Sequence, residues 1–122
     1  MTTVRISPAA PMLVSLGSRS IITSPEEILL LEKNGGGTSE ICGYIDLANL
    51  EAGDTVALRL YARVRQNGSW RMYGQEVYTG VQGQPLIFIT PKPETHGLRV
   101  TLQQTAGIPR IVDCEFFRRG GG

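Results

Sequence analysis

Hydrophobic and polar residues alternate without interruption between residues 54 and 65. One parity carries Val56, Leu58, Leu60, Ala62 and Val64, and the other carries Ala57, Arg59, Tyr61, Arg63 and Arg65. Because successive side chains of a β-strand point to opposite faces of its sheet, this run predicts a strand with one buried row and one solvent-facing row. Such a strand needs a second layer to cover its aliphatic row.

Similar strand patterns follow at residues 38–47, 98–104 and 111–118. The continuous apolar run 86–90 predicts a short strand that is buried on both sides and ends at Pro91. We therefore expect an all-β fold of about seven to eight mainly antiparallel strands, arranged as a single-domain β-sandwich. A jelly-roll-like arrangement or a small barrel is the alternative, because the period of a strand does not reveal how sheets close.

The dipeptide Asn67-Gly68 predicts a tight hairpin turn in which Gly68 has a positive φ. The return strand is expected at residues 70–78. A two-residue loop would set Val77 opposite Leu58, whereas a three-residue loop would shift the register by one. A bulge at Gly74 would reconcile the two registers.

Residues 21–33 permit two interpretations. Ser24, Pro25 and Glu27 stand where a capping serine, a first-turn proline and a capping-box glutamate would begin a helix. The segment allows barely two turns before a glycine-rich stretch, and isolated short helices are marginal. We favour a strand here.

The ends of the chain differ from its middle. Pro8 and Pro11 exclude regular pairing close to the N-terminus, so residues 1–20 are expected to form an extended arm. Residues 21–119 would then form the sandwich domain, and 120–122 a flexible glycine tail. The arm is expected to contact a neighbouring molecule through its apolar residues, which are Met12, Leu13, Val14 and Leu16.

Twelve basic and eleven acidic residues leave a formal net charge of +1, so no long-range field draws the chain to nucleic acid or to an anionic membrane. No apolar run approaches the roughly 20 residues of a membrane span, and the N-terminus lacks the layout of a signal peptide. We expect synthesis in the cytoplasm. Cys42 and Cys114 are expected to be buried free thiols, with a disulfide between neighbouring strands as the alternative.

Candidate chemistry is sparse. The single histidine, His96, lies in an expected loop, and the carboxylates are spread over several elements. Neither a histidine-based metal cluster nor a Ser-His-Asp array can be drawn from these residues. We therefore expect a protein that is not an enzyme, with no catalytic residue, no metal and no cofactor.

One expected surface combines arginines with aromatic rings on the central hairpin. Its members are Arg59, Tyr61, Arg63, Arg65, Trp70, Arg71 and Tyr73. Residues of these types dominate protein interfaces and can also stack on bases or sugars. An ordinary solvent-facing sheet, with arginine stems covering tyrosine rings, is the alternative.

Three segments resemble a group of small β-rich proteins encoded in structural-gene regions of tailed bacteriophages. They are GYIDLANLEAGDTV at 43–56, LYARV at 60–64 and GLRVTLQQTAG at 97–107, within a resemblance that covers residues 38–117. The resemblance implies a virion structural protein, such as a capsid decoration or auxiliary head protein. Its implied partner is the major capsid protein or another virion protein, with self-association into a homo-oligomer, and its location is the virion.

A second hypothesis is a carbohydrate-binding or receptor-binding module, in which Trp70, Tyr73 and Tyr78 would form a stacking platform. Exposed rings in one groove would favour this second hypothesis. Rings buried in a subunit contact would favour the virion role.

Overall fold

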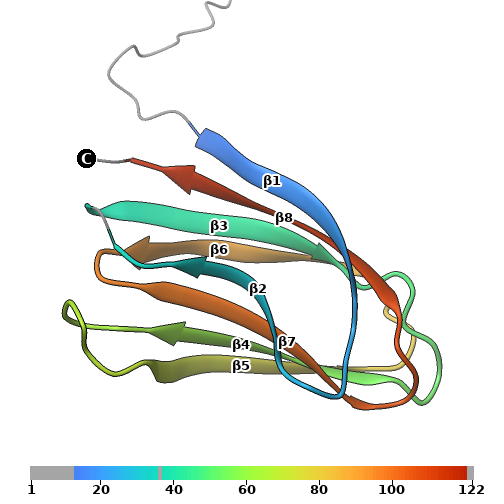
Figure 1. The fold of residues 1–122 in the computed structure, drawn as a ribbon. Helices are drawn as coiled ribbons and strands as arrows, with labels where there is room; N and C mark the ends of the chain where they lie inside the picture. The colour runs from blue at the N-terminus through green and yellow to red at the C-terminus, as the bar shows by residue number, and fades with distance from the viewer. Residues whose placement is uncertain (1–12, 36, 121–122) are drawn as a thin grey trace, which may run out of the picture.

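The computed structural model describes residues 13–35 and 37–120, and all of its regular elements are β-strands (Figure 1). The strands are β1 (Leu13–Ile22), β2 (Ile28–Lys33), β3 (Ser39–Asp46), β4 (Thr55–Ala62), β5 (Arg71–Thr79), β6 (Leu86–Glu94), β7 (Leu98–Ala106) and β8 (Ile111–Arg119). They form two four-stranded antiparallel sheets, in the orders β1-β8-β3-β6 and β2-β7-β4-β5. The sheets stay open at their edges, which confirms the predicted β-sandwich and excludes the barrel.

The strand pairing is that of one long hairpin folded over on itself. β1 pairs with β8, β2 with β7, β3 with β6 and β4 with β5. Two further pairs, β3 with β8 and β4 with β7, join these ribbons into the two sheets. This is the strand order of a jelly roll, the alternative arrangement that the sequence left open.

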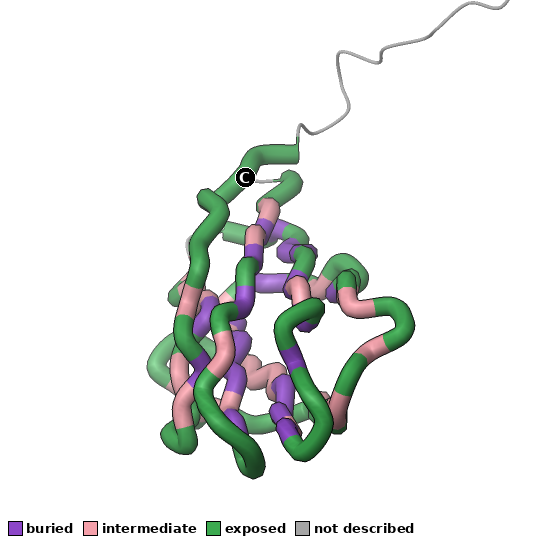
Figure 2. Tube along the Cα trace, turned by 90° about the vertical axis from the view of Figure 1, so that its right-hand side faces the viewer, coloured by how far each residue is buried: buried purple, intermediate pink, exposed green. Residues whose placement is uncertain are grey.

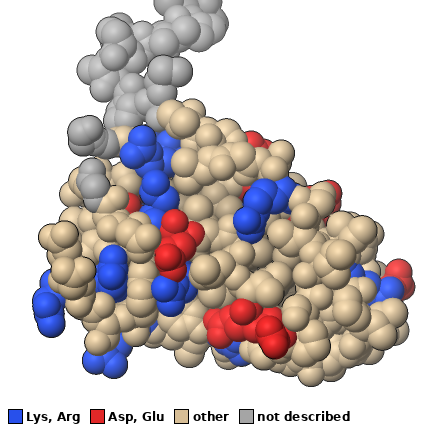
Figure 3. Space-filling view, in the orientation of Figure 1, with Lys and Arg blue, Asp and Glu red and all other residues tan. Residues whose placement is uncertain are grey.

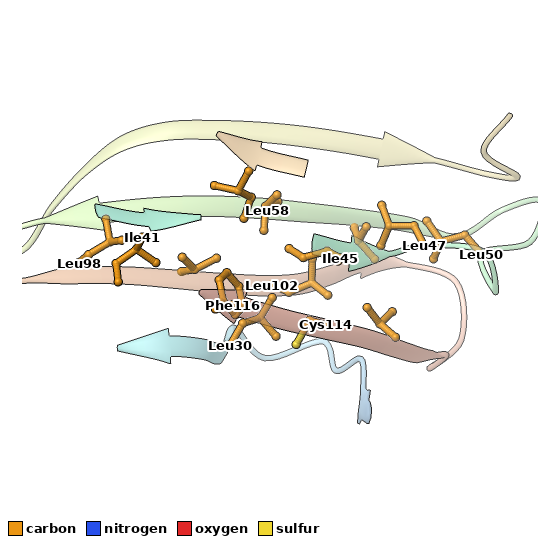
Figure 4. Packing of buried hydrophobic residues seen from close by; sticks show 14 residues of the cluster. Leu30, Ile41, Ile45, Leu47, Leu50, Leu58, Leu98, Leu102, Cys114 and Phe116 are labelled. Carbon is orange, nitrogen blue, oxygen red and sulfur yellow. The ribbon is translucent and has the colours of Figure 1, made fainter. Parts of the chain in front are cut away.

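The core lies between the two sheets, where the inward rows of both meet. Leu58 and Leu102 from one sheet face Ile45 and Phe116 from the other (Figure 4). Figure 2 shows buried positions gathered between the layers, while the outer positions are exposed. Full burial of each large aliphatic side chain contributes about 1.5–3 kcal/mol, so this row is the main source of stability.

Residues 28–33 form strand β2, which confirms the strand interpretation of this region. The hydroxyl of Ser24 accepts a hydrogen bond from the Glu26 amide at 3.1 Å. This contact is a local turn before the strand rather than a helix cap.

The predicted boundary of the arm at residue 20 is wrong. Strand β1 begins at Leu13 and pairs with β8 from Leu13↔Arg119 to Ile22↔Ile111. Both prolines of the N-terminal segment precede this strand, so nothing prevents residues 13–20 from joining the sheet. The first twelve residues, including Met12, lie outside the described part of the chain.

Strand β6 also differs from its prediction. It continues through Pro91 and Pro93 to Glu94, and it lies at a sheet edge instead of being buried on both sides. An edge strand leaves alternate N–H groups unpaired, so it tolerates residues that lack this donor. Leu86 and Phe88 are consequently exposed, by 57% and 46%.

The central hairpin has a longer loop than Asn67-Gly68 suggested. β4 ends at Ala62, Val64 is 87% exposed, and neither predicted register occurs because Leu58 faces Glu76. The turn closes with a 3.0 Å hydrogen bond from the Gly68 amide to the Arg65 carbonyl. Asn67, and not Gly68 as predicted, has the positive φ of 59°. A bulge is present next to Gly74, where Tyr73 is the extra residue.

Candidate binding surfaces

Trp70 lies at the centre of an arginine–tryptophan network on the outer face of the β2-β7-β4-β5 sheet. The guanidinium carbons of Arg63 and Arg99 lie 4.6 and 4.2 Å from the centroid of its ring. Arg63 also donates to the His96 carbonyl oxygen at 2.9 Å. At Gly97, a Cβ would come within 2.7 Å of the indole, so the ring packs directly on the backbone. Its own chain thus covers most of the Trp70 side chain, which is partly buried.

Arg59 and Tyr61 adjoin this network, because Tyr61 lies opposite Arg99 on β7, and both contact Glu27. The Tyr61 hydroxyl and the Thr101 hydroxyl each donate to Glu27 at 2.5 Å, and Arg59 lies 3.6 Å from the same carboxylate. Burial alone would raise the pKa of Glu27, but the bonds from Thr101 and Tyr61 and the charge of Arg59 lower it below 4.5. Arg59 also donates to the side chain of Gln103 at 2.7 Å.

Arg99 is neutralised by Glu32 across the β2–β7 pair, at an N–O distance of 2.5 Å. The hydrogen bond from Arg99 lowers the pKa of the Glu32 carboxyl. Acidic and basic side chains are interspersed on the side of the molecule shown in Figure 3. The network therefore satisfies most of its own charges and donors.

The seven predicted surface residues do not form one site. Arg63 and Trp70 belong to the network, and Arg59 and Tyr61 adjoin it through their contacts with Glu27. Arg65 and Arg71 line a shallow depression by the hairpin loop. Tyr73 lines a separate cleft between β5 and β6.

A different aromatic surface lies on the outer face of the β1-β8-β3-β6 sheet. This aromatic patch consists of Tyr44, Leu86, Phe88 and Phe117. The centroid of the Tyr44 ring lies 5.1 Å from that of Phe88 and 6.2 Å from that of Phe117. Tyr44 is 41% exposed, Phe88 46% and Leu86 57%.

This patch was not predicted from the sequence, because residues 86–90 were expected to be buried on both sides. The alternation of side chains along a strand offered a usable signal. Tyr44 is adjacent to the buried Ile45 and Phe117 to the buried Phe116, so both rings point to the outer face. Their convergence depends on the order β8-β3-β6, which parity does not give.

Carboxylates border the aromatic patch. Asp46 on β3 lies directly opposite Asp113 on β8, and Glu115 lies opposite Tyr44. The hydroxyl of Ser20 donates to Asp113 at 2.5 Å, and that of Ser15 donates to Glu115 at 2.6 Å. These are neutral partners, so the border of the patch keeps its negative charge.

Each open side of the sandwich contains a cleft. One, of about 430 Å³, lies between β5 and β6 and is lined by Tyr73, Glu76 and Tyr78 among others. The other, of about 340 Å³, lies between β1 and β2. Arg19 crosses this second cleft and donates to the Leu30 carbonyl at 3.0 Å.

The predicted arm residues Leu13, Val14 and Leu16 lie on the edge strand β1 and are 54%, 49% and 38% exposed. Cys42 and Cys114 are buried free thiols, and burial raises the pKa of Cys114. Residues 13–35 and 37–120 contain no group of three or more side chains suited to hold a metal ion. Nor do these residues include a helix that is long and apolar enough to cross a membrane.

Comparisons with known proteins add no identification, because no family model, no curated protein and no solved structure matches the chain.

Proposed function

We propose that this chain is a non-enzymatic structural protein of a virion, a capsid decoration or auxiliary protein that binds the major capsid lattice. The aromatic patch is the observation that carries this proposal. Its position on the outer face of a sheet gives a contact surface, and the edge strand β6 places Phe88 and Leu86 at the border of this face. The phage-like segments at 43–56, 60–64 and 97–107 and the jelly-roll strand order support the same role.

The patch has the composition of an interface core. Aromatic residues are enriched at such cores, and polar residues form the rim. Here Tyr44, Phe88 and Phe117 would provide the anchors, while Asp46 and Asp113 would provide an acidic rim. The complementary surface on a capsid protein would be apolar at its centre and basic at its border.

A lattice protein gains strength from repetition. Many weak contacts made at once raise the overall affinity without any additional contact within each site. A modest patch on a small domain suits this arrangement, and the exposed Leu13 of β1 extends the apolar surface beside Ser15 and Phe117. The arginine–tryptophan network is a poorer candidate for the contact, because its groups already bind one another.

The test uses empty shells assembled from the major capsid protein whose gene lies nearest to that of this chain. The native protein is expected to co-sediment with these shells and to be found by mass spectrometry in purified particles. The double variant Tyr44→Ser, Phe88→Ser should bind at least about tenfold more weakly, because it loses two aromatic anchors. Val77→Ser is the matched control, since Val77 is 56% exposed on the outer face of the opposite sheet.

Two results would count against this proposal in different ways. If the native chain binds no shell and is absent from particles, the virion role is wrong. If it binds and the double variant binds equally well, the role holds and the contact lies elsewhere, with Arg65 and Arg71 the next surface to test.

The carbohydrate-binding or receptor-binding hypothesis remains a second candidate. Two arginines already lie over the ring of Trp70, so this residue is a poor stacking platform. Tyr73 and Tyr78, the other two members of the expected platform, line the same cleft. That observation leads to a separate proposal.

A further inference from the structure

The cleft between β5 and β6 is an opening between the edges of the two sheets. β5 closes one sheet and β6 closes the other, and the chain passes between them through residues 80–85. The cleft volume of about 430 Å³ falls within the range of small-molecule sites, which is roughly 300–1,000 Å³. Its floor is apolar and includes Leu58, Leu60 and Ile89.

Two backbone features shape this opening. Gly74 faces Leu60, and a Cβ at this position would lie 3.3 Å from the Leu60 side chain, so any larger residue would fill part of the floor. The bulge places Tyr73 outside the regular alternation of β5. Bulges redirect side chains in this manner, and the Tyr73 ring lines the cleft.

Polar groups from both edges meet over the apolar floor. From β5, the Tyr78 hydroxyl donates to Glu76 at 2.5 Å. From β6, Lys92 donates to the Thr90 hydroxyl at 3.0 Å. The Tyr78 hydroxyl is protonated at neutral pH like that of any tyrosine, and burial raises its pKa further. The cleft thus presents two tyrosine rings, one carboxylate, one ammonium group and a hydroxyl.

We propose that the β5–β6 cleft binds one ring of an uncharged sugar. The apolar C–H face of a pyranose can lie against a tyrosine ring, while its hydroxyls both donate and accept hydrogen bonds. Glu76 provides an acceptor, Lys92 a donor, and Thr90 either. Because the two charges are of opposite sign, a charged ligand would meet one like charge, which favours a neutral one. The cleft adjoins the aromatic patch, because Phe88 lines both, but Tyr73, Glu76 and Lys92 belong to the cleft alone.

The test is a titration of the full chain that is monitored by ¹⁵N–¹H NMR. Glucose, galactose, mannose and N-acetylglucosamine are each added up to about 50 mM, because a single sugar ring is expected to bind with millimolar affinity. We expect at least one sugar to shift the amide signals of residues 73–78 and 88–92 in a saturable manner. Tyr73→Ala should weaken binding about tenfold or more, because it removes a stacking face. Glu76→Gln is a second variant that preserves side-chain shape but removes the charge, and it should weaken binding severalfold.

Tyr44→Ala is the control, since it removes a tyrosine of comparable exposure from the aromatic patch and should leave sugar binding unchanged. Absence of a saturable shift with every sugar would overturn the proposal. Glu76 would then be an inward-pointing charge that protects the β5 edge from pairing with other chains. Shifts that depend on protein concentration but not on sugar would also overturn it, because they would show a second copy of the chain in the cleft.

Discussion

The two outer faces of this sandwich are both rich in aromatic residues, yet they differ in what those residues contact. On the β2-β7-β4-β5 sheet, Trp70 contacts two arginines that are themselves held by a carbonyl and a carboxylate. On the β1-β8-β3-β6 sheet, Tyr44 and Phe88 contact each other and solvent. Composition alone therefore does not mark a binding surface. What marks one is that its rings stay exposed to solvent instead of being covered by other side chains of the chain.

The two outer faces are expected to differ most in how much their aromatic residues contribute to the free energy of unfolding. Trp70→Ala should lower the free energy of unfolding by about 2–3 kcal/mol, because it removes the packing on Gly97 and two cation–π contacts. Tyr44→Ala should lower it by only about 0.5 kcal/mol, because it removes an exposed cross-strand pair. Urea denaturation measures both values. Equal losses would show that the two faces contribute alike and that the contrast between them is mistaken.

A buried carboxylate tests whether a polar group without a partner destabilises the interior. Glu94 is 2% exposed, and its Oε2 atom has no hydrogen-bond partner within the described residues. A buried group without a partner costs about 1–3 kcal/mol. Glu94→Met, which has a similar size, should therefore raise the free energy of unfolding by about 1 kcal/mol. The melting temperature measures this effect, and a lower melting temperature for the variant than for the native chain would contradict the expectation.

Glu27 shows the opposite case, a carboxylate with several partners. Glu27→Gln should lower the free energy of unfolding by about 1 kcal/mol at neutral pH, because it weakens the contacts of Tyr61, Thr101 and Arg59. The pKa of Glu27 is lowered by folding, so its contribution is present above the ordinary value of 4.5 and is lost as the pH falls through the folded value. The difference in melting temperature between the native chain and the variant should therefore shrink in acid. A difference that does not depend on pH would exclude the ionised carboxylate as the cause.

The sequence predicted those parts of the fold that depend on local alternation. The inward row Val56, Leu58 and Leu60 and the strands at β3, β7 and β8 follow from it. The course of β6 through two prolines does not, because only the sheet order shows that this strand is an edge. The register of β4 and β5 was missed because the chain leaves the sheet at Ala62, before the expected turn.

The contacts on the candidate surfaces also depend on the order of the strands, which local alternation does not predict. Parity places Arg59 and Tyr61 on an outer face, but their partner Glu27 comes from the segment before β2, and this contact needs the order β2-β7-β4. Local pattern gives the face of a side chain. Only the fold over the whole chain gives its neighbours.

The smallest expected effect on stability belongs to the aromatic patch, and measuring it distinguishes the two outer faces most directly. Tyr44→Ser together with Phe88→Ser should change the free energy of unfolding by about 0.5 kcal/mol, because the two rings form one exposed cross-strand pair. The same double variant should bind a hydrophobic dye less than the native chain, whereas Val77→Ser should not. Urea denaturation and dye fluorescence provide the two readouts. If the double variant unfolds as readily as Trp70→Ala, the patch is part of the stabilising structure, and a partner would have to bind elsewhere.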